Sequence, residues 1–319
     1  MPTQLLTRAE VVAGYGPVLA GFAPAPADHP LAAGLPAGSV TDDTEQALLL
    51  ARCLVSGAGR VDPRTWAGRL AEWQVDLARR GSADLLGPST RAALAAVAAG
   101  TPPEQAGAHG DTNGAAMRVT PVGIATAPGP RLADAVAAVS RVTHGTDVAL
   151  SGATAVAAAV STGVDGADVP GAVQAALVAA PAGAALGRGT DAPPLAPLIA
   201  AAVERTAAGR AGGVGPAGVS DIIAAEVGTG MAVTESVPAA FAALAAVPDD
   251  PWTACRVAAS VGGDSDTIAA LVGAIAGACH GAAALPSDAI ELVLATNGLD
   301  RAELTGLAGA LLDLRRVGR

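Results

Sequence analysis

The chain has 319 residues, of which 51% are hydrophobic but only 2% aromatic, and its formal net charge is −10. This length allows one large domain or two modest ones, with a core that small aliphatic side chains must fill. All of its basic residues are arginines and they form no cluster, so a surface that binds nucleic acid is not expected.

The first third of the chain begins with a loop and continues with helices. Residues 23–39 are rich in proline and glycine, which predicts a loop. Apolar residues then recur at helical spacing in residues 44–55, 63–80 and 87–99. Each of these segments ends at or near a glycine, which is typical of the end of a helix. Residues 101–114 are polar and glycine-containing, and a second loop is expected there.

The remaining two thirds are predicted to be almost entirely helical. Residues 211–221 are glycine-rich and are expected to be loosely structured. Period-2 strand patterns, a fixed-period repeat and a clear linker are all missing. The sequence therefore predicts an all-α protein with a single domain over residues 1–319 and about a dozen helices. The expected helical or buried segments in this part are 115–127, 130–144, 148–164, 171–180, 196–209, 237–247, 252–261, 266–282 and 288–297.

Cysteine usage and apolar run lengths indicate a cytoplasmic protein. Cys53, Cys255 and Cys279 show no CxxC spacing, which argues against a disulfide framework and a zinc site with sulfur ligands. They are interpreted as small buried residues in a reducing compartment. The N-terminus lacks a signal-peptide pattern, and the longest apolar runs, of about a dozen residues, are too short to cross a bilayer. No contact with a membrane is expected.

Two pairs of aspartates stand directly before apolar helical patterns. In the stretch SVTDDTEQALLL, Asp42 and Asp43 lie between two threonines. In SVGGDSDTIAALVGAIAGA, Asp264 and Asp266 follow two glycines and precede Thr267. Each pair can be read as an N-cap, because aspartate and threonine accept hydrogen bonds from the free N–H groups of a first helical turn.

A shared cation site is the alternative to capping. One cap needs only one side chain, so the second carboxylate of each pair needs another explanation. If the two helix starts face each other, four carboxylates in one cleft repel one another unless a cation lies among them. Carboxylate and hydroxyl oxygens suit Mg²⁺, Mn²⁺ or Ca²⁺ rather than zinc or copper. Composition alone does not bring the two pairs together.

A family resemblance connects the two pairs. The segments TDDT, NGAAMR, TH, GTGMAVTESVPAAFAAL and GGDSDTIAALVGAIAGA occur in the order seen in ADP-ribosylglycohydrolases. That family includes the enzyme that reactivates dinitrogenase reductase and the mammalian ADP-ribosylhydrolases. The segments lie at residues 41–44, 113–118, 143–144, 228–244 and 262–278, and the similar region spans roughly residues 11–285.

The resemblance implies a compact bundle of many orthogonal helices around a cleft that holds two divalent cations, Mg²⁺ or Mn²⁺. Its members cleave the glycosidic bond at the anomeric carbon of an ADP-ribosyl group, on a protein or in a smaller ADP-ribose-type molecule. The metals face the ribose diol and the attacking water. By similarity, the metal ligands are Thr41, Asp42, Asp43, Asp264, Asp266 and Thr267.

The resemblance also implies a substrate-binding loop and a set of candidate bases. Asn113, Gly114 and Ala115 would lie along the ribose and diphosphate, with His144 near the phosphates. The transition state of glycoside cleavage resembles an oxocarbenium ion, which nearby carboxylates stabilise. The catalytic base is expected to be one of three carboxylates that the sequence does not rank, Asp42, Asp43 and Asp264. A simple turn at Asn113 and a structural role for His144 remain open.

Five other polar residues raise weaker expectations. Arg118 is interpreted as a buried partner of a carboxylate or carbonyl, and Glu235 as either a structural hydrogen-bonding residue or a catalytic one. His29, His109 and His280 are expected in loops or at helix ends without a partner.

Three departures from the family pattern leave the substrate open. The family's glycine-rich opening helix has no counterpart before Tyr15, and Asp28 is the only acid between Val11 and Val40, where some members place a metal-covering glutamate. Thr112 replaces a glycine before Asn113, and a β-branched residue resists unusual backbone angles.

Two alternatives to ADP-ribosyl hydrolysis stay open. The departures favour a glycosidase for a smaller ribosylated metabolite or a nucleoside. The other alternative, by similarity to some relatives, is a non-catalytic protein that binds ADP-ribose or has a structural role. The second ranks last because all six presumed metal ligands are present. The oligomeric state is open.

Overall fold

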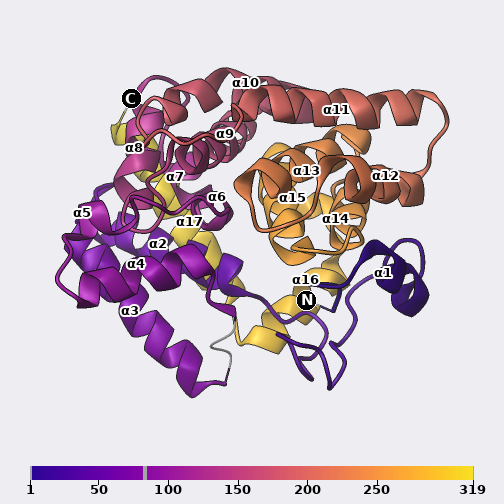
Figure 1. Cartoon of the computed structure of the whole chain (residues 1–319), viewed down its shortest axis with the longest axis horizontal. Helices are drawn as coiled ribbons and strands as arrows, with labels where there is room; N and C mark the ends of the chain where they lie inside the picture. The colour runs from indigo at the N-terminus through magenta and orange to yellow at the C-terminus, as the bar shows by residue number, and fades with distance from the viewer. Residues whose placement is uncertain (1, 82–84, 319) are drawn as a thin grey trace.

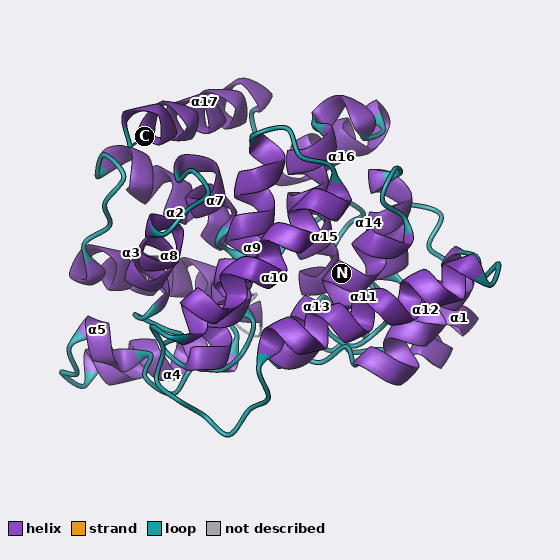
Figure 2. Cartoon of the chain, turned by 90° about the horizontal axis from the view of Figure 1, so that it is seen from above, coloured by secondary structure: helices purple, strands orange, loops and turns teal. Residues whose placement is uncertain are grey.

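The computed structural model describes residues 2–81 and 85–318, which form helices and connecting loops without a β-strand (Figures 1 and 2). The all-α prediction is confirmed. Two isolated β-bridges, Thr112–Ala232 and Thr146–Arg188, are the extent of extended pairing among these residues. The α-helices are α1 (Arg8–Tyr15), α2 (Asp42–Ser56), α3 (Pro63–Arg79), α4 (Pro88–Ala98), α5 (Pro103–Ala106), α6 (Gly114–Met117), α7 (Thr120–Ala125), α8 (Arg131–Ser140), α9 (Asp147–Val164), α10 (Val169–Ala184), α11 (Leu195–Ala211), α12 (Pro216–Ile222), α13 (Val233–Ala246), α14 (Pro251–Ala259), α15 (Ser265–His280), α16 (Ser287–Asn297) and α17 (Arg301–Val317). A π-helical turn, η2 (Ile223–Val227), and a 3₁₀ turn, η3 (Ala282–Ala284), complete the set.

The described residues contain more helices than the expected dozen, because several predicted loops and long segments hold short helices. Residues 101–114 contain α5, and the glycine-rich residues 211–221 contain most of α12. Both begin with a proline, Pro103 and Pro216, whose fixed φ suits the first turn and whose missing N–H has no intrahelical partner there in any case. The expected segment 115–127 is split into α6 and α7.

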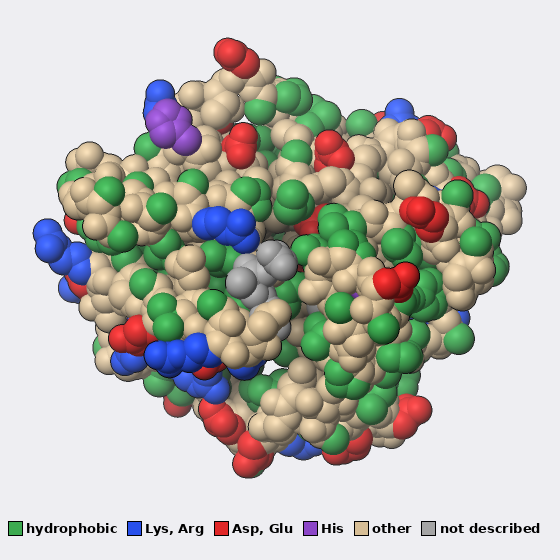
Figure 3. Space-filling model, turned by 60° about the horizontal axis from the view of Figure 1, so that its bottom comes forward, with side chains coloured by type: hydrophobic (Ala, Val, Ile, Leu, Met, Phe, Trp, Pro, Cys, Tyr) green, Lys and Arg blue, Asp and Glu red, His purple; other side chains and the backbone are tan. Residues whose placement is uncertain are grey.

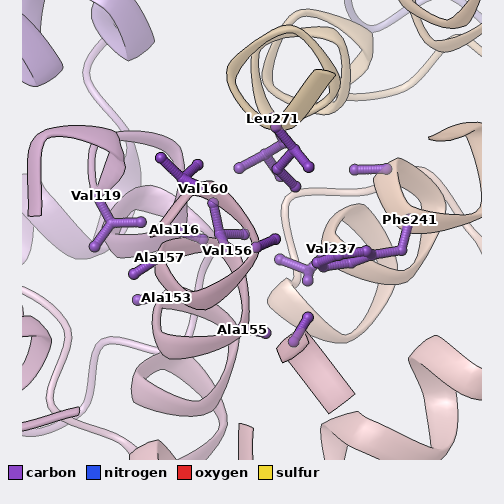
Figure 4. Close-up of a cluster of buried hydrophobic side chains, with 14 of the residues drawn as sticks. Ala116, Val119, Ala153, Ala155, Val156, Ala157, Val160, Val237, Phe241 and Leu271 are labelled. Atoms are coloured by element: carbon purple, nitrogen blue, oxygen red, sulfur yellow. The ribbon is translucent and has the colours of Figure 1, made fainter. Parts of the chain in front are cut away.

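Helix α9 forms the centre of the core. It packs on α10, α15, α7, α6 and α8, and most of its side chains are fully buried. Val156 and Val160 of this helix lie among Leu271 of α15 and Val237 of α13 (Figure 4). The packing depends on small residues: a Cβ at Gly152 would lie 2.4 Å from a methyl carbon of Val233. The alanine- and glycine-rich composition therefore lets helix backbones approach closely.

The burial of α9 also bears on the expected absence of a membrane span. With 18 residues, it is longer than the apolar runs counted in the sequence, and it is the one described helix that is long and apolar enough to cross a bilayer. However, 83% of it is buried inside the protein. That burial is characteristic of the core helix of a globular fold.

The other helices surround this centre in groups (Figures 1 and 2). Helices α10 and α11 follow one another along the top of Figure 1, α2 to α5 lie on one flank, and α12 to α14 lie on the other. The chain returns through α17, which packs against α7 and α2. Buried Arg315 fixes this return by donating to the carbonyl oxygen of Ser161 at 2.8 Å and pairing with Asp165 at 2.7 Å.

Charged side chains are interspersed on the surface. On the face shown in Figure 3, arginines stand singly or in small groups beside acidic residues, with apolar side chains between them. Most ion pairs among the described residues are exposed, such as Arg52–Glu303 at 2.7 Å. Exposed pairs of this kind contribute little to stability.

Candidate metal centre

Six helices of the described chain begin with a side-chain N-cap, but the two that begin with paired acids do not. Thr41 precedes α2 and Asp264 precedes α15, and neither side chain accepts a hydrogen bond from its own first turn. The expectation of ordinary capping is therefore wrong for Thr41 and for Asp264. The capped helices begin after Thr7, Asp62, Thr146, Asp168, Asp250 and Asp300.

The start of α15 is held by a glycine elbow. Gly262 and Gly263 have φ of 78° and 61°, a region that L-residues with a side chain adopt at a cost. Space is also short, because a Cβ on Gly263 would lie 2.4 Å from the carbonyl oxygen of Thr229. The same carbonyl accepts the N–H of Asp264 at 2.6 Å, and the N–H of Gly263 donates to the carbonyl of Leu6 at 2.8 Å. The elbow is thus clamped between the N-terminal segment and the loop before α13.

The start of α2 is held by side chains. The hydroxyl of Thr41 donates to Asp43 at 2.5 Å, and the amide of Gln46 donates to Asp42 at 3.3 Å. Arg118, which is 1% exposed, donates in turn to the amide oxygen of Gln46 at 2.8 Å. Arg118 therefore supports Asp42 through Gln46, in agreement with its interpretation as a buried partner.

The two acidic helix starts meet. We name Asp42, Asp43, Asp264 and Asp266 the acid cluster. The first three residues are buried, and Asp266 is half-buried with both carboxylate oxygens shielded from solvent. Burial, followed by the charge of Asp266, raises the pKa of Asp43 to about 7, and burial together with Asp43 raises the pKa of Asp264 to about 6. Thr267, on α15, acts in the opposite direction and favours the charged form of Asp43 on α2, which lowers the pKa of that carboxyl.

The other two members of the acid cluster respond in the same direction. The pKa of Asp266 is raised to about 7 by burial and by Asp264. Burial raises the pKa of Asp42 well above its ordinary value, with a further contribution from Asp43. At this buried site, each of the four carboxylates thus opposes the ionisation of the other three.

The chemistry of the acid cluster fits a hard divalent cation. One oxygen of Asp43 and both oxygens of Asp266 are buried without a hydrogen-bond partner. Arg118 is the nearby cation, and burial lowers its pKa to about 10 although Asp42 acts to raise it. Among the described residues, no three acidic, histidine or cysteine side chains are already drawn together around one point as ligands. The donor set therefore suits Mg²⁺ or Mn²⁺, and binding would require these carboxylates to turn toward the ion.

The loop that carries Asn113 touches the acid cluster directly. The Asn113 amide donates to Asp264 at 2.5 Å and to the hydroxyl of Ser236 at 3.0 Å. The N–H of Asn113 donates to the carbonyl of Met231 at 3.1 Å, which joins this loop to the segment before α13. Asn113 is therefore more than a turn residue, because it orients a carboxylate of the acid cluster.

His144 lies behind this loop rather than in an open pocket. It is 0% exposed, and its two ring nitrogens are hydrogen-bonded to the hydroxyls of Thr143 at 2.7 Å and Thr112 at 3.0 Å. Burial and the charge of Arg118 lower its pKa well below the ordinary value, so the ring is neutral. A Cβ on Gly114 would lie 2.7 Å from this ring, which explains why the position is a glycine.

Thr112 is compatible with this loop. Among the described residues, positive φ at positions other than glycine occurs at Leu5 and Ala58, and not at Thr112. Its hydroxyl donates to Ser89 at 2.9 Å and reaches His144. The β-branched residue therefore stabilises the loop without backbone strain. Direct contact of Gly114, Ala115 and His144 with a substrate stays a prediction.

Glu235 has a structural position. Its carboxylate accepts the N–H of Gly230 at 2.8 Å, and a Cβ on Gly228 would lie 2.8 Å from its side chain. This contact holds the loop whose Thr229 carbonyl anchors Asp264. Glu235 therefore acts on the acid cluster indirectly.

Three histidines expected to lack partners do have them. His29 is hydrogen-bonded to the carbonyl of Gln4 at 3.0 Å and also accepts the N–H of Ala32. His109 contacts a guanidinium nitrogen of Arg188 at 2.8 Å, and His280 contacts the carbonyl of Pro248 at 2.8 Å. The partners Gln4, Arg188 and Pro248 are 25 to 79 positions away along the chain, so the local sequence gave no sign of these contacts.

Two cavities border the start of α2. The first cavity, of about 330 Å³, is lined by Thr41 and Asp266 together with mainly apolar residues of the 19–23 loop, α14 and α15. The second cavity, of about 360 Å³, shares Thr41 and Thr44 with the first and is otherwise lined by Glu45 and Arg80 among others. Asn113 and His144 line neither cavity.

A family model described as ADP-ribosylglycohydrolase matches residues 1–319 of the chain. The chain belongs to the ADP-ribosylglycohydrolase family. A solved structure titled "ADP-ribosylglycohydrolase-related protein complex" shares the fold, with a TM-score of 0.62 and 26% identity over 100% of this chain and 98% of that one.

Two similar curated proteins carry no functional name. The uncharacterized protein YegU of Escherichia coli (strain K12) is 32% identical over 302 residues, which cover 94% of this chain and 89% of that protein. An uncharacterized protein of Archaeoglobus fulgidus is 36% identical over 165 residues, covering 51% of this chain and 50% of that protein. As an ADP-ribosylglycohydrolase family member, the chain is expected to be a hydrolase that acts on an ADP-ribose-type substrate, but no named relative assigns the aglycone.

Sequence reasoning missed several residues that support the site. Gln46 was detectable in principle, because it lies four positions after Asp42 and so on the same helix face. Ser236, Thr229 and Thr143 lie inside the segments that carry the family resemblance, but they were given no role there. Ser236 and Thr229 contact Asn113 and Asp264 from far along the chain, and Thr143 bonds the neighbouring His144.

Proposed function

We propose that this protein is a metal-dependent glycohydrolase that cleaves the glycosidic bond at the anomeric carbon of an ADP-ribosyl group, on a protein side chain or a small conjugate. The observation that carries this proposal is the acid cluster, whose four buried carboxylates come from two helix starts and include three oxygens without a partner. Such a cluster costs free energy unless a cation neutralises it.

Six residues are proposed to hold two divalent cations. Mg²⁺ or Mn²⁺ would supply positive charge that neutralises the acid cluster and polarises substrate oxygens. Neighbouring side chains fix the carboxylates of the acid cluster: Asn113 orients Asp264, and Gln46 orients Asp42. The proposed ligands are Thr41, Asp42, Asp43, Asp264, Asp266 and Thr267.

Among the three candidate bases, Asp43 has the most suitable geometry. One of its oxygens accepts from Thr41, while the other has no partner and can accept a proton from water. Asp264 shares an oxygen with the Asn113 amide, and Asp42 with Gln46. Negative charge from the same carboxylates also stabilises the oxocarbenium-like transition state at the anomeric carbon.

Calorimetry with ADP-ribose tests this proposal. We expect ADP-ribose to bind, more tightly with Mg²⁺ or Mn²⁺ than with a chelator, and release of ADP-ribose from a conjugate to stop on chelation. Hydrolysis that is unaffected by chelation would contradict the dimetal mechanism. Binding of ADP-ribose without any hydrolysis would instead favour the non-catalytic alternative.

A smaller ribosylated substrate is the second candidate, and burial of the Asn113 loop favours it. Gly114 and Ala115 are buried, and this loop lines neither cavity beside the acid cluster. A diphosphate would therefore require this loop to open, whereas a nucleoside or simple riboside would not. Hydrolysis of ribosides in the presence of Mn²⁺, combined with no binding of ADP-ribose, would decide for this candidate.

A further inference from the structure

The first cavity adjoins the acid cluster on a side that the Asn113 loop does not reach. Thr41 and Asp266 form part of its wall, whereas Asn113 contacts the acid cluster through Asp264. The acid cluster therefore has the Asn113 loop on one side and the first cavity on another. A substrate whose anomeric carbon lies at the acid cluster can place its leaving group in this cavity.

The wall of the first cavity is mainly apolar and offers few acidic partners to a cationic group. Apart from Asp266, the wall contains no carboxylate, and its one arginine, Arg256, already donates to the carbonyl of Leu19 at 2.5 Å. Cys255 contributes a neutral thiol, since burial raises its pKa to about 12. A guanidinium leaving group would find one acidic partner here, and that carboxylate belongs to the acid cluster.

Two aromatic rings stand together in the wall of the first cavity. Phe22, from the loop after Leu19, and Trp252, from the first turn of α14, stand edge to face with ring centroids 5.6 Å apart and planes inclined by 67°. Both line the cavity. In a protein with only 2% aromatic residues, this is a rare concentration of ring surface. Such a pair offers one ring face and one ring edge to a flat guest.

We propose that the first cavity binds the leaving group of the hydrolysed substrate, and that Phe22 and Trp252 select an uncharged aromatic leaving group over a guanidinium. This inference rests on the proposed glycohydrolase function and adds to it the class of aglycone. In the reaction, the bond between the anomeric carbon and the leaving heteroatom breaks. The oxygen of water bonds to that carbon, and one proton of the water ends on the leaving group, which departs neutral.

Two substrates with the same ADP-ribosyl part test the selection. One carries a 4-nitrophenyl group and the other an arginine side chain. Because 4-nitrophenol leaves more readily than guanidine in any case, the informative quantity is the change in the ratio of their kcat/KM values. We expect Phe22→Leu and Trp252→Leu to lower kcat/KM for the 4-nitrophenyl substrate by about 3- to 10-fold, as the loss of an aromatic contact predicts. For the arginine substrate, we expect a change of less than about 2-fold.

A control variant and a binding measurement complete the test. Leu48→Ala alters the second cavity and not the first, so it should leave the ratio unchanged. Binding of free 4-nitrophenol to the metal-free protein, measured by calorimetry, should weaken in Trp252→Leu and not in Leu48→Ala. Thermal unfolding of each variant would verify that the fold persists.

The outcomes separate this inference from the function on which it rests. If both substrates are hydrolysed and the Phe22 and Trp252 variants affect them equally, the leaving group does not occupy the first cavity. If Leu48→Ala alone shifts the ratio of the two kcat/KM values, the leaving group occupies the second cavity. If the wild-type protein with Mg²⁺ or Mn²⁺ hydrolyses neither substrate, the proposed function fails and the leaving-group assignment fails with it, whatever 4-nitrophenol binding shows about the cavity.

Discussion

Aspartates stand at the starts of several helices in this protein, and they have opposite properties in two kinds of place. Asp62 and Asp250 cap α3 and α14 near the surface, and hydrogen bonds from Thr65 and Thr253 hold the pKa of each below its ordinary value. At α2 and α15, burial raises the pKa of every member of the acid cluster.

Solvent access and neighbouring charge produce this difference. An exposed cap receives N–H donors and keeps its water, so its charge is favoured. A member of the acid cluster loses its water and faces three other carboxylates, so its charge is disfavoured. Natural proteins place such an arrangement at functional sites, because only a ligand restores the lost stabilisation. The same residue type before the same element thus serves stability in one place and chemistry in the other.

Exchange of aspartate for asparagine is expected to have the largest effect. Asp264→Asn removes a charge from the acid cluster and should lower kcat/KM by about 100-fold or more. Asp168→Asn is the matched control, because Asp168 is an exposed cap of α10 and asparagine caps equally well. Release of ADP-ribose with Mg²⁺ or Mn²⁺ measures both. Equal activity in the two variants would show that the acid cluster is only structural.

Glycine substitutions should separate the clamped helix start from an ordinary helix end. Gly263 and Gly281 both have positive φ, 61° and 75°, but a Cβ at Gly281 would meet nothing within 4 Å. Gly281→Ala should therefore cost about 1–2 kcal/mol of unfolding free energy from backbone strain alone. Gly263→Ala should cost roughly 1–3 kcal/mol more, because its methyl group overlaps Thr229. Urea unfolding measures the difference, and equal losses would mean that the elbow yields freely.

The pH dependence of stability should have opposite signs for the two kinds of aspartate. The pKa of Asp43 rises from 3.8 to about 7, so the folded state holds a proton that the unfolded state releases. This contribution to stability is full below the unfolded pKa and is lost as the pH rises through about 7. The lowered pKa of Asp250 acts in the reverse direction, and its contribution is lost as the pH falls.

Thermal unfolding of the metal-free protein would measure the balance. With a chelator present, we expect the unfolding midpoint to fall between about pH 5 and about pH 8, because the acid cluster outweighs the exposed caps. Mg²⁺ or Mn²⁺ should restore the midpoint, and by more at the higher pH, where the carboxylates are ready to bind it. A midpoint that rises with pH in the chelator would contradict the raised pKa values.

Removal of an ordinary cap should have the smallest effect. Asp168→Ala deprives the N–H of Gly171 of its acceptor at 2.9 Å and should cost about 1 kcal/mol of unfolding free energy. Its kcat/KM should stay within about 2-fold of the wild-type value, because α10 contributes nothing to the acid cluster. A large loss of activity in this variant would show that the cap of α10 affects the acid cluster.

Much of the site could be predicted because its residues sit in short local patterns. The paired acids in the first turns of α2 and α15 marked both helix starts, and Asn113 marked the loop that meets them. The roles of Ser236 and Thr229 could not be predicted in this way, since a hydroxyl or a carbonyl becomes a partner only when another segment reaches it. The position of His144 behind the loop rather than at its open side depended likewise on Thr112 and Thr143.

Local sequence patterns are sufficient to predict the helical architecture, because small apolar residues recur at helical spacing with prolines at helix starts and glycines at helix ends. The same patterns show which carboxylates are paired. That Asp43 and Asp266 lie together at one buried site, with the rings of Phe22 and Trp252 in contact beside it, follows only from the packing of distant segments. The physical reason is that burial and electrostatic coupling depend on distances between segments more than 200 positions apart, which no local spacing specifies.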